Sequence, residues 1–262
     1  MAATRANVGE HAADSAFQQT ESPLFTLEFD KLKVLGTRPM AIPNYYLVTY
    51  APLVMSSAGR EASSLQGLPP FIDGSIRREP DLEHEYPAIS CLCRADNFTP
   101  RLKLGDIVGY MTKKAKYKNP SPHRRLTAIL KVRDMFPTHA EAAAWYRTCD
   151  MPLPNNCMVS GNDPIPLSAS NRMRDDNSLL SDAKAARNCD AQFRLRAKSF
   201  GTFVVCRVLF RDLSWNAPVV TDDTLIAAFG RIPATQNPGN LSSRCFRQLL
   251  DLLGIGAVLP SP

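Results

Sequence analysis

Six basic side chains lie between residues 113 and 125, in a segment that also contains a tyrosine and a histidine. Lysine and arginine bind phosphate oxygens without reading base sequence, and an aromatic ring placed among them can stack on a base. A solvated loop whose charge only keeps the protein soluble is an equally good interpretation of this pattern. The candidate nucleic-acid-binding residues are Lys113, Lys114, Lys116, Tyr117, Lys118, His123, Arg124 and Arg125.

The net charge favours an anionic partner. Lysine and arginine together number 31, aspartate and glutamate number 25, and the formal net charge is +6. A moderate positive charge is compatible with nucleic acid, although its distribution matters more than its total. A second basic cluster supports phosphate binding, and it consists of Arg194, Arg196, Lys198, Arg207 and Arg211.

The sequence holds no motif that identifies a metal or catalytic centre. Cys91 and Cys93 would share one face of a strand, but no second cysteine pair with zinc-ligand spacing follows them. Small buried packing residues are the ordinary interpretation of such cysteines. Glycine-rich nucleotide-binding loops and nucleophile elbows are also missing from the sequence. We therefore expect no metal and no cofactor, and the sequence leaves any catalytic residues unknown.

Composition predicts a folded cytoplasmic protein. Apolar residues make up 44% of the 262 residues and charged residues 21%, as in ordinary globular domains. Residues 1–22 have the composition of a disordered tail, so the domain is expected to span residues 23–262. Seven cysteines without a signal peptide indicate reduced thiols, and no apolar stretch is long enough to cross a membrane. We expect no membrane partner.

The elements that position these residues are short strands separated by two long segments. Residues 51–87 and 148–199 show no sustained period and are predicted to be irregular insertions, with one possible helix over residues 177–187. The β-branched and aromatic residues between them favour strands. Strands are predicted over residues 44–50, 88–93, 107–111, 126–132 and 202–210.

Three helices have recognisable ends. Thr138 and Glu141 form a capping box that begins a helix running to residue 146. Thr221 is placed to cap a second helix, which Gly230 ends. A third helix begins at a capping Ser243, and its apolar residues at i, i+3, i+4 and i+7 predict docking on the body.

The order of these pieces resembles a known family. The segments YYLVTY (45–50), ISCLC (89–93), LGDIVGY (104–110) and LTAILKV (126–132) precede a helix that ends AAAWY (142–146). This order is similar to the second of the numbered nucleotide-modification-associated domain families, and its turn-strand-loop-strand core is similar to the PUA, ASCH and EVE group of small barrels. The resemblance spans most of residues 44–253. It implies an α+β fold, namely a PUA-like mixed β pseudo-barrel with peripheral helices and two long irregular insertions.

The same resemblance implies a module that recognises or accommodates a modified base or nucleotide in a bacterial or phage DNA-modification or defence setting. Its partner would be nucleic acid, with DNA preferred, or the modified nucleotide itself. Aromatic rings would stack on the base, and polar side chains would read its edge. Two alternatives remain, an enzyme that processes a modified nucleotide and a non-catalytic protein-interaction module. The expected base pocket consists of Tyr46, Asp106, Tyr110, Trp215 and Asn216.

Overall fold

The computed structural model describes residues 42–172 and 181–259. All of these residues belong to one of the two units into which the chain divides, residues 41–262. The predicted disordered tail, residues 1–22, and the expected start of the domain at residue 23 lie outside the described residues. Among the described residues, no helix has the length and apolar character needed to cross a bilayer.

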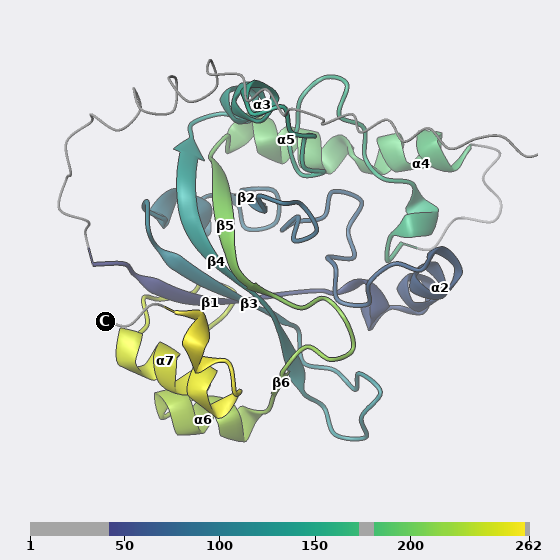
Figure 1. The fold of residues 1–262 in the computed structure, drawn as a ribbon. Coiled ribbons are helices and arrows are strands. Elements are labelled where there is room, and N and C mark those ends of the chain that lie inside the picture. Colours follow the sequence, from purple (N-terminus) through teal and green to yellow (C-terminus); the bar gives the residue numbers. More distant parts are fainter. Residues whose placement is uncertain (1–41, 173–180, 260–262) are drawn as a thin grey trace, which may run out of the picture. The chain divides into compact units, whose positions relative to one another are not determined.

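A curved mixed sheet forms a half-barrel at the centre of this unit (Figure 1). The strand order is β1-β3-β4-β5-β2, and the short β6 pairs with the beginning of β4. The β1–β3 pair is parallel and the other pairs are antiparallel. Register shifts interrupt the β3–β4 and β4–β5 ladders, and such bulges increase twist and bend a sheet. The strands are β1 (Tyr45–Tyr50), β2 (Ala88–Ser90), β3 (Ile107–Thr112), β4 (Arg124–Phe136), β5 (Phe203–Arg211) and β6 (Val219–Val220).

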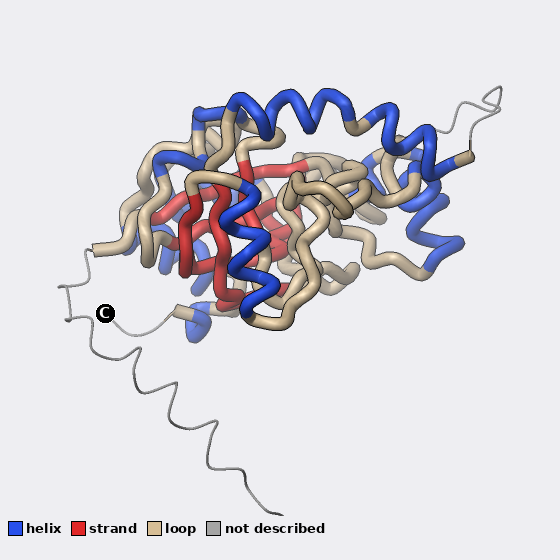
Figure 2. Tube along the Cα trace, turned by 90° about the horizontal axis from the view of Figure 1, so that it is seen from above, coloured by secondary structure: helices blue, strands red, loops and turns tan. Residues whose placement is uncertain are grey.

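Helices lie around this sheet, so the predicted α+β class is confirmed (Figure 2). Both α6 and α7 cover its convex face, where the fully buried Phe246 and Leu249 of α7 pack against Leu47 of β1. Helix α3 packs against the beginning of β5, where Tyr146 of the helix and Phe203 of the strand belong to one buried cluster. The helices of the described residues are α2 (Ser57–Gln66), α3 (His139–Thr148), α4 (Asp182–Cys189), α5 (Ala191–Ser199), α6 (Asp222–Phe229) and α7 (Ser243–Leu252).

Side chains alternate between the two faces of the sheet, as the period of a strand requires. In β1, Tyr46 and Val48 point into the concave side, whereas Tyr45 and Leu47 face α7. The concave side is filled by the chain between β1 and β3, because Leu82, Phe98 and Leu102 belong to the same buried cluster as the inner strand residues. This connection therefore becomes part of the domain's core.

Every predicted strand is present, with different ends. Strand β4 is much longer than the predicted 126–132, and β2 ends at Ser90. Cys91 and Cys93 consequently lie in a turn after the strand, which corrects the expectation that both thiols share a strand face. Two predicted helix caps are confirmed. The side chain of Thr138 accepts a hydrogen bond from the amide of Glu141, and the side chain of Thr221 accepts one from the amide of Thr224.

Three further expectations need correction. The segment 51–87 was expected to be irregular, but α2 occupies part of it, and the side chain of Ser56 caps that helix by accepting from Gly59. The segment 148–199 contains α4 and α5, where one helix over 177–187 was expected; residues 177–180 lie outside the described residues. Ser242, rather than Ser243, occupies the N-cap of α7.

Candidate functional site

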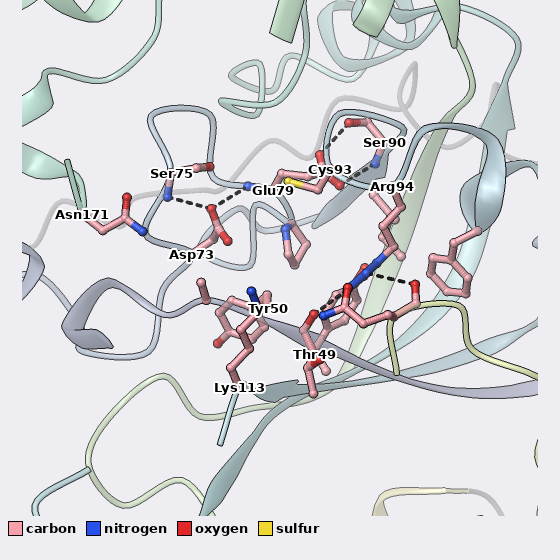
Figure 3. Close-up of a pocket in the computed structure, with 16 residues that line it drawn as sticks. Thr49, Tyr50, Asp73, Ser75, Glu79, Ser90, Cys93, Arg94, Lys113 and Asn171 are labelled. Carbon is pink, nitrogen blue, oxygen red and sulfur yellow. Dashed lines mark hydrogen bonds between the residues drawn. The ribbon is translucent and has the colours of Figure 1, made fainter. Parts of the chain in front are cut away.

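A cavity of about 260 Å³ lies where the parallel strands β1 and β3 reach their carboxyl ends (Figure 3). Its wall is completed by the segment 73–80, the end of β2 and the turn that follows β2. The cavity therefore opens on the concave side of the half-barrel. Its lining comprises Thr49, Tyr50, Ala51, Asp73, Ser75, Glu79, Pro80, Ile89, Ser90, Cys93, Arg94, Phe98, Tyr110, Lys113, Asn171 and Gln236.

Asp73 is a buried acid with one oxygen left without a donor. Its Oδ1 accepts from the backbone amides of Ser75, at 2.9 Å, and Glu79, at 3.1 Å. Within the described part of the chain no donor bonds its Oδ2, so this oxygen is available to a ligand. Burial raises the pKa of Asp73 to about 6, against the opposing effects of the side chain and the amide of Ser75, the charge of Arg78 and the amide of Glu79.

Glu79 is the second buried acid, and both of its carboxylate oxygens accept hydrogen bonds. Oε1 accepts from the amide of Ser90 at 2.9 Å, and Oε2 accepts from the hydroxyl of Ser90 at 2.5 Å and from Asn156 Nδ2 at 2.7 Å. Burial raises the pKa of Glu79 to about 7, the negative charge of Asp73 raises it further, and the hydrogen bonds from Ser90 and Asn156 lower it. Near neutral pH, the two acids are therefore close to the point of proton uptake or release.

The segment that carries both acids is fixed by two buried arginines. Arg77 pairs with Asp190 and also donates to the carbonyl oxygens of Asn155 and Asn162, at 3.1 and 2.8 Å. Arg78 donates to the carbonyl oxygens of Asp73 and Ala169, at 2.5 and 2.8 Å. These bonds satisfy the backbone of a segment without regular structure, so it can hold its acids in one position.

Tyr110 of β3 adds a phenol to the cavity. Its ring is only 2% exposed, and its hydroxyl has no hydrogen-bond partner within the described residues. Burial raises its pKa, as does the charge of Glu79, whereas Arg94 acts in the opposite direction. The neighbouring Tyr50 differs, because its hydroxyl bonds to the carbonyl of Phe71 and to Thr127 Oγ1. Tyr110 thus offers a free, neutral hydroxyl to a ligand.

Two cations complete the lining. Lys113 follows β3 directly, and its backbone amide donates to the carbonyl of Tyr50 at 2.8 Å. Arg94 follows β2 and donates to the carbonyl of Thr49 at the end of β1. The cavity consequently combines buried acids that can be neutral with a lysine and an arginine, a combination suited to a polar ligand that carries or adjoins an anionic group.

The expected base-pocket residues do not meet in one place. Tyr110 lines the cavity, but Tyr46 packs edge-on against Phe98 in the core, with ring centroids 5.5 Å apart. Asp106 holds the turn before β3 by accepting from the backbone amides of Asn44 and Lys103, each at 2.9 Å. Trp215 lies elsewhere, its ring 5.1 Å from that of Phe71, and Asn216 is exposed beside it.

The basic loop, residues 113–125, places its side chains in three environments. Lys113 lines the cavity, whereas Lys114 and Arg124 form ion pairs with Asp222 at 2.5 and 2.6 Å. Lys116 and Lys118 line a separate groove of about 530 Å³ with Trp215, and the Lys118 ammonium lies 4.0 Å from the centroid of that ring.

The other members of the loop have structural contacts. Tyr117 and His123 are buried, and their rings meet edge-on at 5.7 Å. Arg125 donates to the carbonyl oxygens of Trp215 and Ala217, at 3.1 and 2.8 Å. These contacts hold the hairpin between β3 and β4 against the loop before β6.

The sequence interpretation missed Asp73, Glu79 and Arg94. Charged residues in a segment rich in glycine, proline and serine normally indicate a solvated loop. The apolar pair Phe71 and Ile72 directly before Asp73 is the one local signal that this segment is anchored, and both residues are almost fully buried.

Among the described residues, no group of three or more histidine, cysteine or acidic side chains is arranged to hold a metal ion. Searches with protein-family models, against curated proteins and against solved structures found no match to this chain. Function must therefore be inferred from the geometry of the cavity.

Proposed function

We propose that this protein binds a modified nucleobase, or the nucleotide that carries it, in the cavity between Asp73, Glu79 and Tyr110. The observation that supports it is the coincidence of three buried polar groups at one cavity, two of them acids whose pKa lies near neutrality. Asp73 Oδ2 and the Tyr110 hydroxyl have no intramolecular partner among the described residues. Both residues line the cavity, so a ligand there can bond these two oxygen atoms.

The chemistry of a base edge fits these groups. Bases present N–H donors next to ring nitrogen or carbonyl acceptors, and flipped bases are read by hydrogen bonds to that edge. A neutral carboxyl group offers a donor and an acceptor side by side, whereas a carboxylate only accepts. The raised pKa of Asp73 makes its neutral form accessible near pH 7, whereas both oxygens of Glu79 already accept hydrogen bonds from Ser90 and Asn156. A cavity of about 260 Å³ suits a small ligand such as one base rather than a larger molecule.

The proposed bacterial or phage DNA-modification or defence setting rests on the resemblance of the sequence to the nucleotide-modification-associated family, and the half-barrel is compatible with the PUA, ASCH and EVE group. The partner in this proposal is DNA. All seven cysteines are free thiols, which favours the cytoplasm as its compartment.

Titration with a panel of nucleosides and nucleotides tests this proposal. The panel pairs each unmodified cytosine and adenine compound with its substituted form, and binding is followed by calorimetry. We expect one modified member to bind, and Asp73→Asn and Tyr110→Phe to weaken that binding at least tenfold. Glu61→Gln, which changes an exposed acid on α2, is the control and should leave affinity unchanged. Failure of every panel member to bind the wild-type protein would reject the proposal.

A second candidate function is catalysis on the same ligand. A general acid or base works best when its pKa lies near the working pH, and both cavity acids satisfy this condition. Incubation of the bound nucleotide followed by mass spectrometry distinguishes the two functions, since only an enzyme changes the ligand's mass.

A further inference from the structure

An open groove of about 460 Å³ adjoins the cavity. Three residues, Cys93, Arg94 and Gln236, line both hollows, so the groove continues directly from the cavity wall. Its walls come from the turn after β2, from α5 and from the loop before α7. The remaining lining residues are Ala95, Asn97, Arg196 and Asn237, and no acidic side chain from the described part of the chain lines the groove.

The two arginines of the groove keep donors free. Arg196 of α5 donates from Nη1 to the carbonyl of Leu92 at 2.7 Å. Arg94 donates to the carbonyl of Thr49 and, at 3.5 Å, to that of Gln236. Neither side chain forms an ion pair with any described residue. A guanidinium has five N–H donors, so each of these side chains can still bind an anion.

A third arginine fixes the walls of the groove relative to each other. Arg101 donates to the carbonyl of Asn97 at 3.0 Å and to Asn237 Oδ1 at 2.7 Å. It also donates to the carbonyl of Pro238 at 2.9 Å. The groove is therefore held open by hydrogen bonds across it, and Arg101 acts as a positioning residue.

The groove differs from the basic loop in both charge and place. Lys114 and Arg124 of the loop are already paired with Asp222. The groove that holds Lys116 and Lys118 shares no lining residue with the cavity, and Lys118 covers one face of Trp215. Together with Lys113 in the cavity itself, Arg94 and Arg196 are thus the cations best placed to bind an anionic group joined to a molecule in the cavity.

We infer that this groove binds the phosphate next to the base in the cavity, so that the ligand is a nucleotide within a single-stranded or locally opened polynucleotide. This inference rests on the proposed function and identifies its substrate class. Phosphate contacts position a strand, whereas base contacts specify it, and arginine binds phosphate oxygens through paired N–H donors. The groove supplies the first kind of contact and the cavity the second.

The test compares two ligands that carry the same modified base: the free nucleoside, and a short single-stranded oligonucleotide with that base at its centre. We expect the oligonucleotide to bind more tightly, with an affinity that falls as salt rises. Arg196→Gln should weaken oligonucleotide binding about tenfold and reduce the salt slope by about 1, because one phosphate contact is lost. Nucleoside binding should not change.

Lys198→Gln is the matched control, since Lys198 is exposed on the same helix but lines neither hollow. It should leave both affinities unchanged, and Arg196→Lys should retain most of the salt dependence. If Arg196→Gln has no effect on oligonucleotide binding while the nucleoside still binds, the inference is overturned and the proposed function stands. If neither ligand binds the wild-type protein, both are overturned.

Discussion

Arg77 and Asp190 form a bidentate ion pair in the interior of the protein, with Nε to Oδ1 at 2.6 Å and Nη2 to Oδ2 at 2.5 Å. The two side chains are 3% and 0% exposed. Arg77 precedes β2, and Asp190 lies between α4 and α5, so the pair joins two long segments that have no local pattern in common. Because Arg77 lies between Asp73 and Glu79 in sequence, the same pair holds the cavity wall.

Replacing one partner of this pair should destabilise the protein severely. Asp190→Asn leaves the Arg77 guanidinium buried without its counter-charge, which typically costs about 3–5 kcal/mol. We expect a lower midpoint in urea denaturation. The matched control is Asp163→Asn, which removes an exposed acid 3.4 Å from Arg187 and should change the free energy of unfolding by less than about 0.5 kcal/mol. Equal midpoints for the two variants would show that the buried pair contributes no more to the free energy of unfolding than the exposed pair does.

The apolar double variant Arg77→Met with Asp190→Leu separates charge from packing. Apolar pairs of similar volume often replace buried ion pairs without loss of stability. The double variant should therefore be more stable than Asp190→Asn alone. Its affinity for the cavity ligand should nonetheless fall, because Arg77 also donates to the carbonyl oxygens of Asn155 and Asn162 and so shapes the segment that carries the acids.

Much of the fold was predictable because its signals are local. β1 combines β-branched and aromatic residues, and α3 begins at a threonine that accepts from an amide three residues later. Such patterns act within a few residues, so the sequence alone reveals them. The end of β2 was not predictable, because Cys91 and Leu92 are as fully buried as the residues of the strand itself. Only the turn in the backbone after Ser90 ends the strand before them.

The cavity was far less predictable, because its acids are buried by distant parts of the chain. Asp73 and Glu79 lie in a segment with no apolar period. Asn156 donates a hydrogen bond to Glu79, Asn171 lines the cavity, and both follow many residues later in the sequence. Trp215 illustrates the opposite error, since an aromatic residue in a loop suggested base stacking but packs on Phe71. Long-range pairing of polar groups leaves no spacing rule in a single sequence.

The free energy of unfolding should fall as pH rises from about 4 to about 7. In the folded protein the pKa of Glu79 lies near 7 and that of Asp73 near 6, above their ordinary values of 4.5 and 3.8. These two acids therefore hold more protons in the folded state than in the unfolded state in this interval, and their contribution to stability is lost as the protons dissociate. His139 acts in the opposite direction, because burial lowers its pKa to about 4, but the two acids together outweigh it. For Glu79 alone the effect is roughly 3 kcal/mol.

Urea denaturation at pH 4.5 and pH 8 measures this dependence. Glu79→Gln removes the titrating group, so the difference in stability between the two pH values should be smaller in the variant than in the wild-type protein. Glu61→Gln on the surface of α2 should leave the difference unchanged. The raised pKa of Glu79 would be contradicted if the wild-type protein were more stable at pH 8 than at pH 4.5 and Glu79→Gln showed the same difference in stability.

Gly109 of β3 allows α7 to approach the sheet closely. A Cβ at this position would lie 3.0 Å from Leu47 Cδ1 and 3.1 Å from Phe246 Cζ. Gly109→Ala should therefore cost about 1–3 kcal/mol of stability through overpacking. Gly239→Ala is the control, because a Cβ there would meet no atom of the described residues within 4 Å. Thermal melts that move equally for the two variants would refute the close packing of α7 on β3.

Gly74 permits Asn171 to reach the cavity wall. A Cβ on Gly74 would lie 2.6 Å from Asn171 Nδ2 and 2.9 Å from Asn171 Cβ, closer than side chains pack. The backbone amide of Asn171 also donates to the carbonyl of Gly74 at 2.7 Å, so the two segments cannot simply move apart. Gly74→Ala should lower stability by about 1–3 kcal/mol and weaken ligand binding, because the strain falls beside Asp73.

A double-mutant cycle with Asn171→Gly tests that cause directly. Asn171→Gly removes both the amide and the Cβ that a new methyl group would meet, so the double variant should recover most of the stability that Gly74→Ala loses, and the two effects should not add. Denaturation midpoints of the four proteins give the coupling energy. Strict additivity would mean that Gly74→Ala acts through its own backbone, and the contact with Asn171 would then have no part in shaping the cavity.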